Sequence, residues 1–342
     1  MRALSAITEM FQLHNRIESL WWQQSSPPLL LRAIEPVYAA ISRHQLQRRA
    51  AAPQSPPLPL ISVGNITVGG SGKTPFVLWL AEALKAQGRA PVILCRGDGG
   101  NSDTPRIISA ESSVSQSGDE AKMLAEAAGC PVIAGRDRIA GSRLAAELGD
   151  VIILDDGFQY RHLARYCDIV LIPAEGVGNG HLIPAGPLRE PLAALARADL
   201  IVRTGRKTQL QQCAPLSQQH EWHWWRDGGR LIEVTGTGTS GPPDTMIALT
   251  AIARPHRFFD DLTALGIQLA ARHSFADHHN FTTGELAPLL HQRHDIVVTA
   301  KDAVKLRHIW PDGRPLWVLQ QGGNGESGLL EAISAQLPSP KE

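Results

Sequence analysis

The sequence predicts an α/β protein with a mostly parallel β-sheet, helices on both faces of that sheet, and a second, smaller α/β domain. From Leu58 onward, short apolar runs alternate with helical patterns, as in repeated βα units whose strands are buried on both sides. Near Cys213 the first series of βα units ends, and a second βα series follows. A chain of 342 residues is long enough for two domains. We therefore divide it into residues 1–57, 58–213 and 214–342.

Residues 1–57 are expected to form an N-terminal amphipathic segment. If residues 21–49 are helical, with a kink or restart at Pro36, one face carries four apolar side chains: Leu30, Ile34, Val37 and Ile41. Two interpretations stay open for this helix. It packs on its own domain, or it lies in a membrane interface, which the tryptophans at its start and the arginines towards its end favour.

Charge, cysteines and hydropathy restrict the partners and the compartment. The balance of 33 basic and 33 acidic residues gives no overall field to attract nucleic acid, and no obligate protein partner is evident. The four cysteines are far apart and form no CxxC pair, which indicates a reducing compartment. The N-terminus does not resemble a signal peptide, and no apolar run approaches the roughly 20 residues that span a bilayer. We expect a cytoplasmic protein.

The first βα series follows the proline-rich connector "AAPQSPPLP". Strands are expected at "PLISVG", "APVILCRG", "CPVIAG", "DVIILDD", "DIVLIP" and "DLIVRTG". Helices are expected at "PFVLWLAEALKAQG", "GDEAKMLAEAAG" and "DRIAGSRLAAELG".

The second series begins with "HEWHWW" and "RLIEVTG", predicted strands of a connecting or edge ribbon. Further βα units are expected in "MIALTAIARPHRFFDDLTALG", "IQLAARHSF", "TTGELAPLLHQR", "DIVVTAKDAVKL" and "PLWVLQQ".

The stretch "VGNITVGGSGKTP" lies between the first strand and the first helix and has the features of a phosphate-binding loop. Gly72, Lys73 and Thr74 match the end of the Walker A motif, but Thr67 stands where a glycine normally opens it. The glycines allow backbone amides to turn towards phosphate oxygens, and the following helix directs its positive end at the anion. Lys73 can reach the β- and γ-phosphates, and Thr74 can hold Mg²⁺. The alternative is an ordinary glycine-rich turn, which the lysine and the strand–loop–helix context disfavour.

A carboxylate that serves the metal ion is expected at "VIILDDGFQ". Asp155 or Asp156 ends a strand in the manner of a Walker B aspartate, and neighbouring strands would bring it close to the phosphate loop. The pair Asp-Gly is also a common turn, so these residues alone would indicate only a strand end.

Taken in order, the motifs resemble one family, the tetraacyldisaccharide 4'-kinases, which phosphorylate the lipid A precursor in bacteria with an outer membrane. The resemblance rests on "VGNITVGGSGKTP", "SGDEA", "DDGFQ", "GNGHLIPAGPLREP", "ADHHNF" and "TAKDAVK", across about residues 58–306. A threonine in place of the first Walker A glycine is characteristic of that family, so Thr67 supports the resemblance.

The resemblance implies transfer of the γ-phosphoryl group of ATP to the 4'-hydroxyl of a tetraacylated glucosamine disaccharide 1-phosphate. The implied ATP-binding residues are Thr67, Val68, Gly69, Gly70, Ser71, Gly72, Lys73 and Thr74. The implied Mg²⁺ residues are Thr74, Asp155, Asp156 and Glu190. The implied catalytic residues are Lys73 and Arg189, which stabilise charge, Asp119, which takes the proton from the hydroxyl, and His278, which assists it.

Other interpretations of these residues stay open. Asp119 stands at the start of a predicted helix, where an acidic residue is most often a cap. His278 in a loop could be merely solvated, and a zinc site with His273 and His279 is disfavoured because further ligands are missing. A P-loop GTPase switch or metal-insertion chaperone lacks its Asn-Lys-x-Asp motif, and a nucleotide sensor without turnover would not need Asp119.

The acylated substrate implies contact with a membrane surface, because each methylene exposed to water costs about 0.8 kcal/mol. We therefore expect peripheral attachment at the cytoplasmic face of the inner membrane, with the N-terminal amphipathic segment as the anchor. Four positions depart from the family's usual residues, and we expect them to affect details of substrate contact: Asp98, Ala121, Tyr160 and Tyr166.

Overall fold

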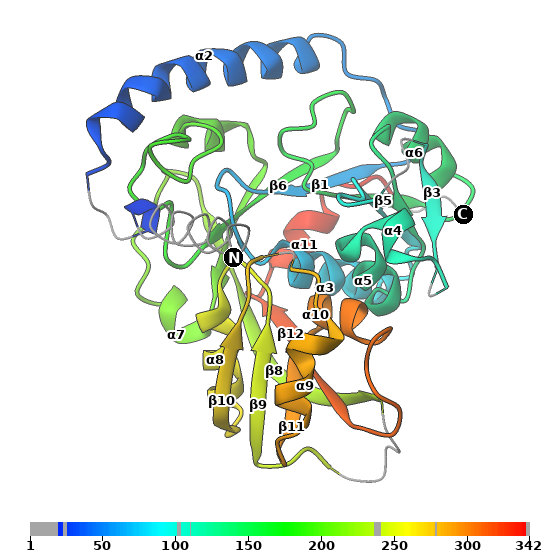
Figure 1. Ribbon diagram of the computed structural model, residues 1–342. Helices are drawn as coiled ribbons and strands as arrows, with labels where there is room; N and C mark the ends of the chain where they lie inside the picture. Colours follow the sequence, from blue (N-terminus) through cyan, green and yellow to red (C-terminus); the bar gives the residue numbers. More distant parts are fainter. Residues whose placement is uncertain are drawn as a thin grey trace.

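A single mixed sheet organises the molecule (Figure 1). The computed structural model describes residues 20–22, 26–100, 104–109, 111–235, 241–277 and 279–339. The sheet has 12 strands in the order β10-β9-β11-β12-β8-β7-β6-β1-β5-β2-β4-β3. The strands are β1 (Leu60–Gly64), β2 (Pro91–Cys95), β3 (Arg106–Ile108), β4 (Val132–Ala134), β5 (Val151–Asp155), β6 (Cys167–Pro173), β7 (Leu200–Gly205), β8 (Glu221–Thr235), β9 (Thr245–Thr250), β10 (Gln268–Ser274), β11 (Asp295–Thr299) and β12 (Leu316–Gly325). The predicted α/β class with a mostly parallel sheet is confirmed.

Helices connect these strands and cover the sheet. They are α2 (Leu29–Ala50), α3 (Lys73–Ala86), α4 (Val114–Ser117), α5 (Asp119–Ala127), α6 (Arg138–Ala145), the 3-10 helix η1 (Leu192–Arg197), α7 (Lys207–Leu210), α8 (Pro255–Ala264), α9 (Thr283–Leu290), α10 (Ala300–Leu306) and α11 (Leu329–Ser334). The short antiparallel edge strand β3 and the helix α11 were not predicted.

The first lobe is built on the parallel strands β6, β1, β5, β2 and β4. Every residue of β1 is buried, because the strand has a hydrophobic core on each side. Ile61 and Val63 pack in the core that includes α3, whereas Leu60 packs in the opposite core. This continuous burial explains why the strand has no polar alternation. It also places the loop between β1 and α3 at the carboxyl end of the sheet, where α/β proteins bind ligands.

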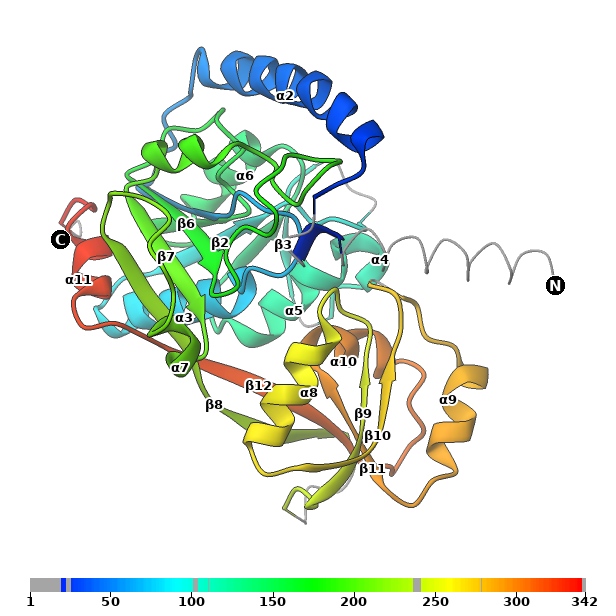
Figure 2. The same ribbon diagram turned by 90° about the vertical axis from the view of Figure 1, so that its left-hand side faces the viewer.

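Strands β8 and β12 connect the lobes, as Figure 2 shows. The beginning of β8 pairs in parallel with β7, and the rest pairs with β12 in antiparallel register. Trp224 of β8 is buried against Phe76 of α3, with ring centroids 5.7 Å apart. The sheet is thus continuous across the predicted boundary near Cys213, and the division into domains stays a proposal. After β12 the chain returns to the first lobe, because Leu329 and Ile333 of α11 pack in the same core as α3.

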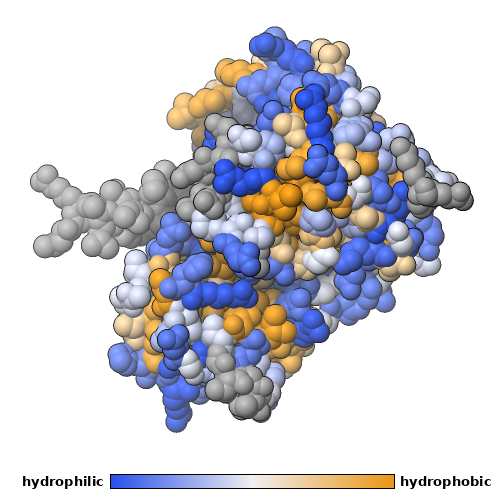
Figure 3. Space-filling model, turned by 90° about the vertical axis from the view of Figure 1, so that its right-hand side faces the viewer, coloured by the Kyte–Doolittle hydropathy of each residue, from blue (hydrophilic) through white to orange (hydrophobic). Residues whose placement is uncertain are grey.

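Helix α2 lies along the outside of the first lobe and has no buried residue. Of the kink or restart expected at Pro36, the restart is wrong, because the helix is continuous through this residue. Large apolar side chains on it are exposed to solvent: Leu29, Leu30, Ile34, Val37 and Ile41. Figure 3 shows hydrophobic residues gathered at the upper left, where the helix begins. In the part of the chain that the structure describes, no helix is both long and apolar enough to cross a membrane.

Polar contacts hold α2 on the first lobe. Glu35 accepts a hydrogen bond from the backbone N–H of Leu182 at 2.7 Å, and its other oxygen lies 2.9 Å from Nδ1 of His181. The Tyr38 hydroxyl donates to the carbonyl of Arg189 at 3.2 Å. The helix therefore sits through its polar side chains on the "GNGHLIPAGPLREP" loop, and its apolar side chains are left exposed.

Candidate active site

A cleft of about 930 Å³ lies where the two lobes meet. The phosphate loop and the start of α3 form one wall, and residues after β9 and β11 of the second lobe line the opposite side. Six of the basic side chains that line it come from both lobes: Lys73, Arg138, Arg189, Arg254, Arg257 and Lys301. Such a cleft suits a ligand with several phosphate charges.

The phosphate loop is held by polar contacts of its own. Lys73 Nζ donates to Asn65 Oδ1 at 3.3 Å, and Asn65 Nδ2 donates to Ser71 Oγ at 2.9 Å. The backbone of Gly72 is left-handed, with φ of 77°, which favours glycine at the position where α3 begins. The predicted loop residues from Gly69 to Thr74 all line the cleft, whereas Thr67 and Val68 lie outside its lining.

The "PLRE" segment pairs with the start of the phosphate loop, which the sequence analysis did not predict. The Val68 N–H donates to the carbonyl of Pro187 at 2.8 Å, and the Arg189 N–H donates to the carbonyl of Ile66 at 2.7 Å. Thr67, which is 2% exposed, forms an antiparallel bridge with Leu188 in this pairing. The residue that replaces the first Walker A glycine is therefore part of a short ladder.

The two aspartates after β5 have different environments. Burial raises the pKa of Asp155 to about 6, with Lys73 acting in the opposite direction. Burial alone would also raise the pKa of Asp156, but Lys73, Arg189 and Arg138 outweigh it and hold that pKa well below its usual range. Lys73 Nζ lies 3.4 Å and Arg189 Nη1 3.1 Å from carboxylate oxygens of Asp156. The structure thus brings the predicted lysine, arginine and aspartates together.

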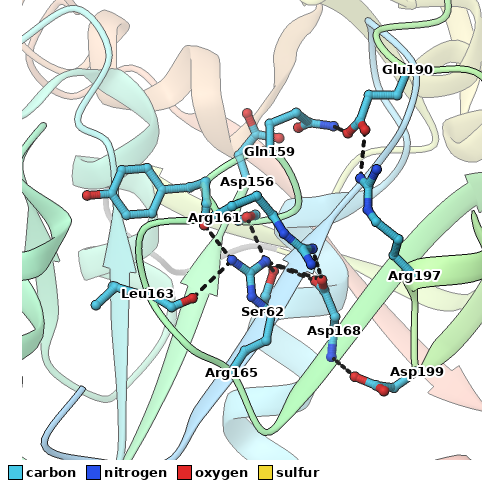
Figure 4. Close-up of polar contacts among 12 residues, drawn as sticks. Ser62, Asp156, Gln159, Arg161, Leu163, Arg165, Asp168, Glu190, Arg197 and Asp199 are labelled. Atoms are coloured by element: carbon cyan, nitrogen blue, oxygen red, sulfur yellow. Dashed lines mark hydrogen bonds and ion pairs between the residues drawn. The ribbon is translucent and has the colours of Figure 1, made fainter. Parts of the chain in front are cut away.

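Glu190 lies behind this group and outside the cleft lining. It is 1% exposed, and its two oxygens accept hydrogen bonds from Gln159 Nε2 at 3.0 Å and from Arg197 Nη2 at 2.6 Å (Figure 4). Gln159 Nε2 also donates to the carbonyl of Asn65 at the phosphate loop, at 2.9 Å. These contacts favour a positioning role for Glu190 over the predicted direct contact with a metal.

A buried ion pair fixes the loop after the two aspartates, and it is a feature that the sequence analysis missed. Arg165 donates to the carbonyls of Gly157 and Leu163, each at 3.2 Å, and pairs with Asp168 at 3.2 Å (Figure 4). Arg161 binds the same Asp168 oxygen at 2.8 Å. One arginine therefore satisfies several carbonyls of the turn that carries the aspartates, and the spacing "RHLARYCD" was the only sequence signal for it.

Asp119 is buried at the start of α5, next to Glu120, which lines the cleft. Its Oδ2 lies 3.1 Å from Nζ of Lys305, which is on α10 of the second lobe. The same ammonium donates to the carbonyl of His279 at 3.2 Å, which brings the "ADHHNF" loop next to Asp119. The N-cap residue of α5 is Gly118, which has no side chain to cap the helix, so Asp119 is not the N-cap. His278 lies outside the described residues.

The "TAKDAVK" segment begins α10 and carries both cleft and core residues. Lys301 lines the cleft, and its Nζ donates to Asp277 at 3.0 Å. Asp302 is fully buried and accepts hydrogen bonds from the Thr250 hydroxyl, the Thr299 hydroxyl and the Ala251 N–H at 2.8, 2.7 and 3.1 Å. The aspartate therefore joins the end of β9 to the start of α10.

Replacing Asp302 by alanine is expected to lower the free energy of unfolding by about 3 kcal/mol, because it leaves buried hydroxyl and amide groups without an acceptor. Asp302→Asn keeps one acceptor oxygen and is expected to cost less. Urea unfolding of both variants measures the difference. A loss below about 1 kcal/mol for the alanine variant would contradict the structural role.

Of the four departures from the family pattern, Asp98 lies in the cleft lining, where its carboxylate is 3.2 Å from Arg96. Tyr160 packs against Arg138, with the guanidinium carbon 4.9 Å from the ring centroid. Tyr166 is exposed, and Ala121 is buried in the core that includes α3. Among these, Asp98 and Ala121 line the cleft.

The described residues contain no group of three or more His, Cys, Asp and Glu that could hold a metal ion by themselves. Mg²⁺ bound with a nucleotide needs fewer protein ligands, because one or two carboxylates suffice when phosphates and waters supply the other ligands. Asp155, Asp156 and Thr74 line the same cleft and supply oxygen ligands, so the residues present fit Mg²⁺ bound together with a nucleotide.

Comparison with known proteins gives consistent results. Residues 28–337 match the family model for tetraacyldisaccharide-1-P 4'-kinase. The tetraacyldisaccharide 4'-kinase of Aeromonas salmonicida is 36% identical over 332 residues, which cover 94% of this chain and 97% of that protein. That of Chromobacterium violaceum is 37% identical over 338 residues, covering 94% and 97%. A crystal structure of LpxK from Aquifex aeolicus in complex with ATP is similar with a TM-score of 0.74 and 29% identity, covering 90% and 98%. The chain therefore belongs to the tetraacyldisaccharide 4'-kinase family.

Proposed function

We propose that the protein transfers the γ-phosphoryl group of ATP to the 4'-hydroxyl of a tetraacylated glucosamine disaccharide 1-phosphate, a step of lipid A biosynthesis. The observation that carries this proposal is one cleft in which the phosphate loop and Asp156 face the second lobe, with the buried Asp119 beside it. Family membership supports the reaction class and the use of ATP. A GTPase switch or chaperone, the other interpretation of the phosphate loop, has no such support.

In the proposed reaction the acceptor oxygen forms a bond to the γ-phosphorus as the bond to the leaving ADP oxygen breaks. Charge spreads over the equatorial phosphate oxygens, and Lys73 and Arg189 are positioned to stabilise it, since both side chains line the cleft. Asp119 receives the hydroxyl proton, and Lys305 supports its negative charge. His278 is proposed to assist Asp119.

Mg²⁺ is proposed as the metal, with Thr74, Asp155 and Asp156 as its protein ligands. When bound, it would neutralise charge on the phosphate oxygens. Both aspartates line the same cleft as Lys73. Burial raises the pKa of Asp155, and a bound cation would keep this carboxylate ionised.

We further propose that the protein attaches peripherally to the cytoplasmic face of the inner membrane. The exposed apolar side chains of α2 support this, because they would be covered by the membrane interface, and Arg43, Arg48 and Arg49 near the end of the helix suit anionic lipid headgroups. The acylated disaccharide substrate would be reached at the same surface.

The test is transfer of labelled γ-phosphate from ATP to a tetraacylated disaccharide 1-phosphate in detergent micelles. The expected product is the labelled bis-phosphorylated lipid, formed with ATP and not with GTP, and only when a divalent metal is present. ATP hydrolysis that does not depend on the lipid, with no labelled lipid, would refute the proposed function and favour a switch or sensor.

A further inference from the structure

Two arginines of the second lobe reach the tip of the phosphate loop. Arg257, in the first turn of α8, donates through Nη1 to the carbonyl of Gly70 at 2.7 Å. Arg254, the residue before α8, passes so close to Gly69 that a Cβ built there would lie 3.7 Å from its Nη2 and 3.8 Å from its Nε. Both guanidinium groups line the same cleft as Lys73. Positive charge from the second lobe therefore lies directly beside the backbone expected to hold the phosphates.

The surroundings of Arg254 hold its side chain in one place. Its guanidinium carbon lies 3.8 Å from the ring centroid of Trp22, in the N-terminal segment, and its Nη1 lies 3.8 Å from an oxygen of Glu175. The side chain is 9% exposed. A planar guanidinium stacked on an aromatic ring directs its N–H groups outward in its own plane. Arg257 is bonded to the same Glu175, so that carboxylate has a cationic partner of its own.

We propose that Arg254 is a catalytic residue for phosphoryl transfer, contributed by the second lobe, and that Trp22 is its positioning residue. This inference rests on the proposed kinase function. As the bond from the γ-phosphorus to ADP breaks and the bond to the acceptor oxygen forms, the hydroxyl proton goes to the base and charge builds on the equatorial phosphate oxygens. Arg254 stabilises that charge from its place beside Gly69 of the phosphate loop, in the manner of an arginine finger supplied by the same chain.

An ion-pair clamp between the lobes is the simpler role for these arginines, and Arg257 fits it better than Arg254 does. The clamp to Glu175 is made by Arg257, at hydrogen-bond distance, whereas Arg254 is 3.8 Å from the same oxygen. Arg254 also lies 3.8 Å from the ring centroid of Trp22 and borders the phosphate loop at Gly69. A clamp would contribute mainly to stability and nucleotide affinity, whereas a catalytic arginine contributes mainly to the rate of transfer.

The experiment compares the full-length wild type with Arg254→Ala, Arg254→Lys and a matched control, Arg272→Ala. Arg272 is also in the second lobe and contacts α8 through Phe259, but it lies outside the cleft lining. We expect kcat to fall about 10³-fold in both Arg254 variants, with the Kd for ATP changed by less than about fivefold. The control is expected to keep kcat within about threefold of the wild type.

A second measurement isolates the transition state without the lipid. ADP with aluminium fluoride mimics the transferring phosphoryl group, and Arg254→Ala is expected to lose at least about 100-fold in affinity for it. Wild-type affinity for this complex in Arg254→Ala, or an unchanged kcat, would overturn the inference. Failure of the wild type to phosphorylate the lipid would instead refute the proposed function, while the fluoride measurement would still test Arg254.

Variants of Trp22 test its positioning role. Trp22→Ala is expected to lower kcat about tenfold without changing the Kd for ATP, and Trp22→Phe, which restores a ring face, is expected to recover most of the loss. A loss in Trp22→Ala that persists when Arg254 is already alanine would contradict a positioning role, because the effect of Trp22 should then disappear.

Discussion

Replacing Lys73 by methionine is expected to lower kcat by about 10²–10³-fold, because the variant loses the ammonium that stabilises charge on the transferring phosphoryl group. The structure holds this side chain between Asn65 and Asp156, at 3.3 and 3.4 Å, so it is already directed into the cleft. Methionine has a similar length and keeps the packing of α3. Phosphate transfer from labelled ATP to the lipid, measured at saturating ATP, gives the change in kcat.

The matched control for Lys73 is Lys207→Met, which removes a lysine on α7 outside the cleft lining. It is expected to leave kcat within about threefold of the wild type. Thermal unfolding of both variants checks that the fold is kept. A Lys73→Met protein that retains more than about a fifth of the wild-type kcat would show that other cations supply the charge stabilisation.

Replacing Asp119 by asparagine is expected to lower kcat by about 10²–10⁴-fold, the usual contribution of a general base. Asparagine has nearly the same shape but cannot accept the hydroxyl proton at neutral pH. The substitution also leaves the ammonium of Lys305 without its carboxylate partner, and the two side chains are only 8% and 7% exposed. We therefore expect a loss of stability of about 3 kcal/mol as well.

The double variant Asp119→Asn with Lys305→Met separates catalysis from stability. It removes both charges, so the unfolding temperature is expected to recover, whereas phosphate transfer stays low. Recovery of activity together with stability would mean that Asp119 acts only as the structural partner of Lys305. Lys305→Met alone tests the support of the base, because it removes the cation 3.1 Å from the Asp119 carboxylate, and kcat is expected to fall.

The two lobes are joined at the site as well as through the sheet. Lys305 reaches Asp119, Arg307 lies 2.9 Å from Glu126, and Arg257 reaches the phosphate loop. Each of these contacts has one partner in each lobe. The base and the phosphate loop of the first lobe are therefore both held by side chains of the second, which gives the second lobe a direct part in the proposed chemistry.

Residues close together in the sequence determined much of what could be predicted. The βα series was predicted because burial on both faces leaves continuous apolar runs, as in β1 and β5. The phosphate loop was predicted because its glycines, Lys73 and Thr74 act within one strand–loop–helix turn, and Thr67 was interpretable only through the family resemblance. The amphipathic face of α2 was visible for the same reason, since helical spacing is a local property.

Only the tertiary structure decided how distant segments meet. No local pattern indicates that Thr67 pairs with Leu188 or that α11 returns to the first lobe. Lys305, which contacts Asp119, and Trp22, which contacts Arg254, come from far along the chain in opposite directions. Charge and stacking interactions depend on distance in space and not on spacing in sequence. The sequence by itself therefore determined the type of site, and packing of the two lobes decided which side chains complete it.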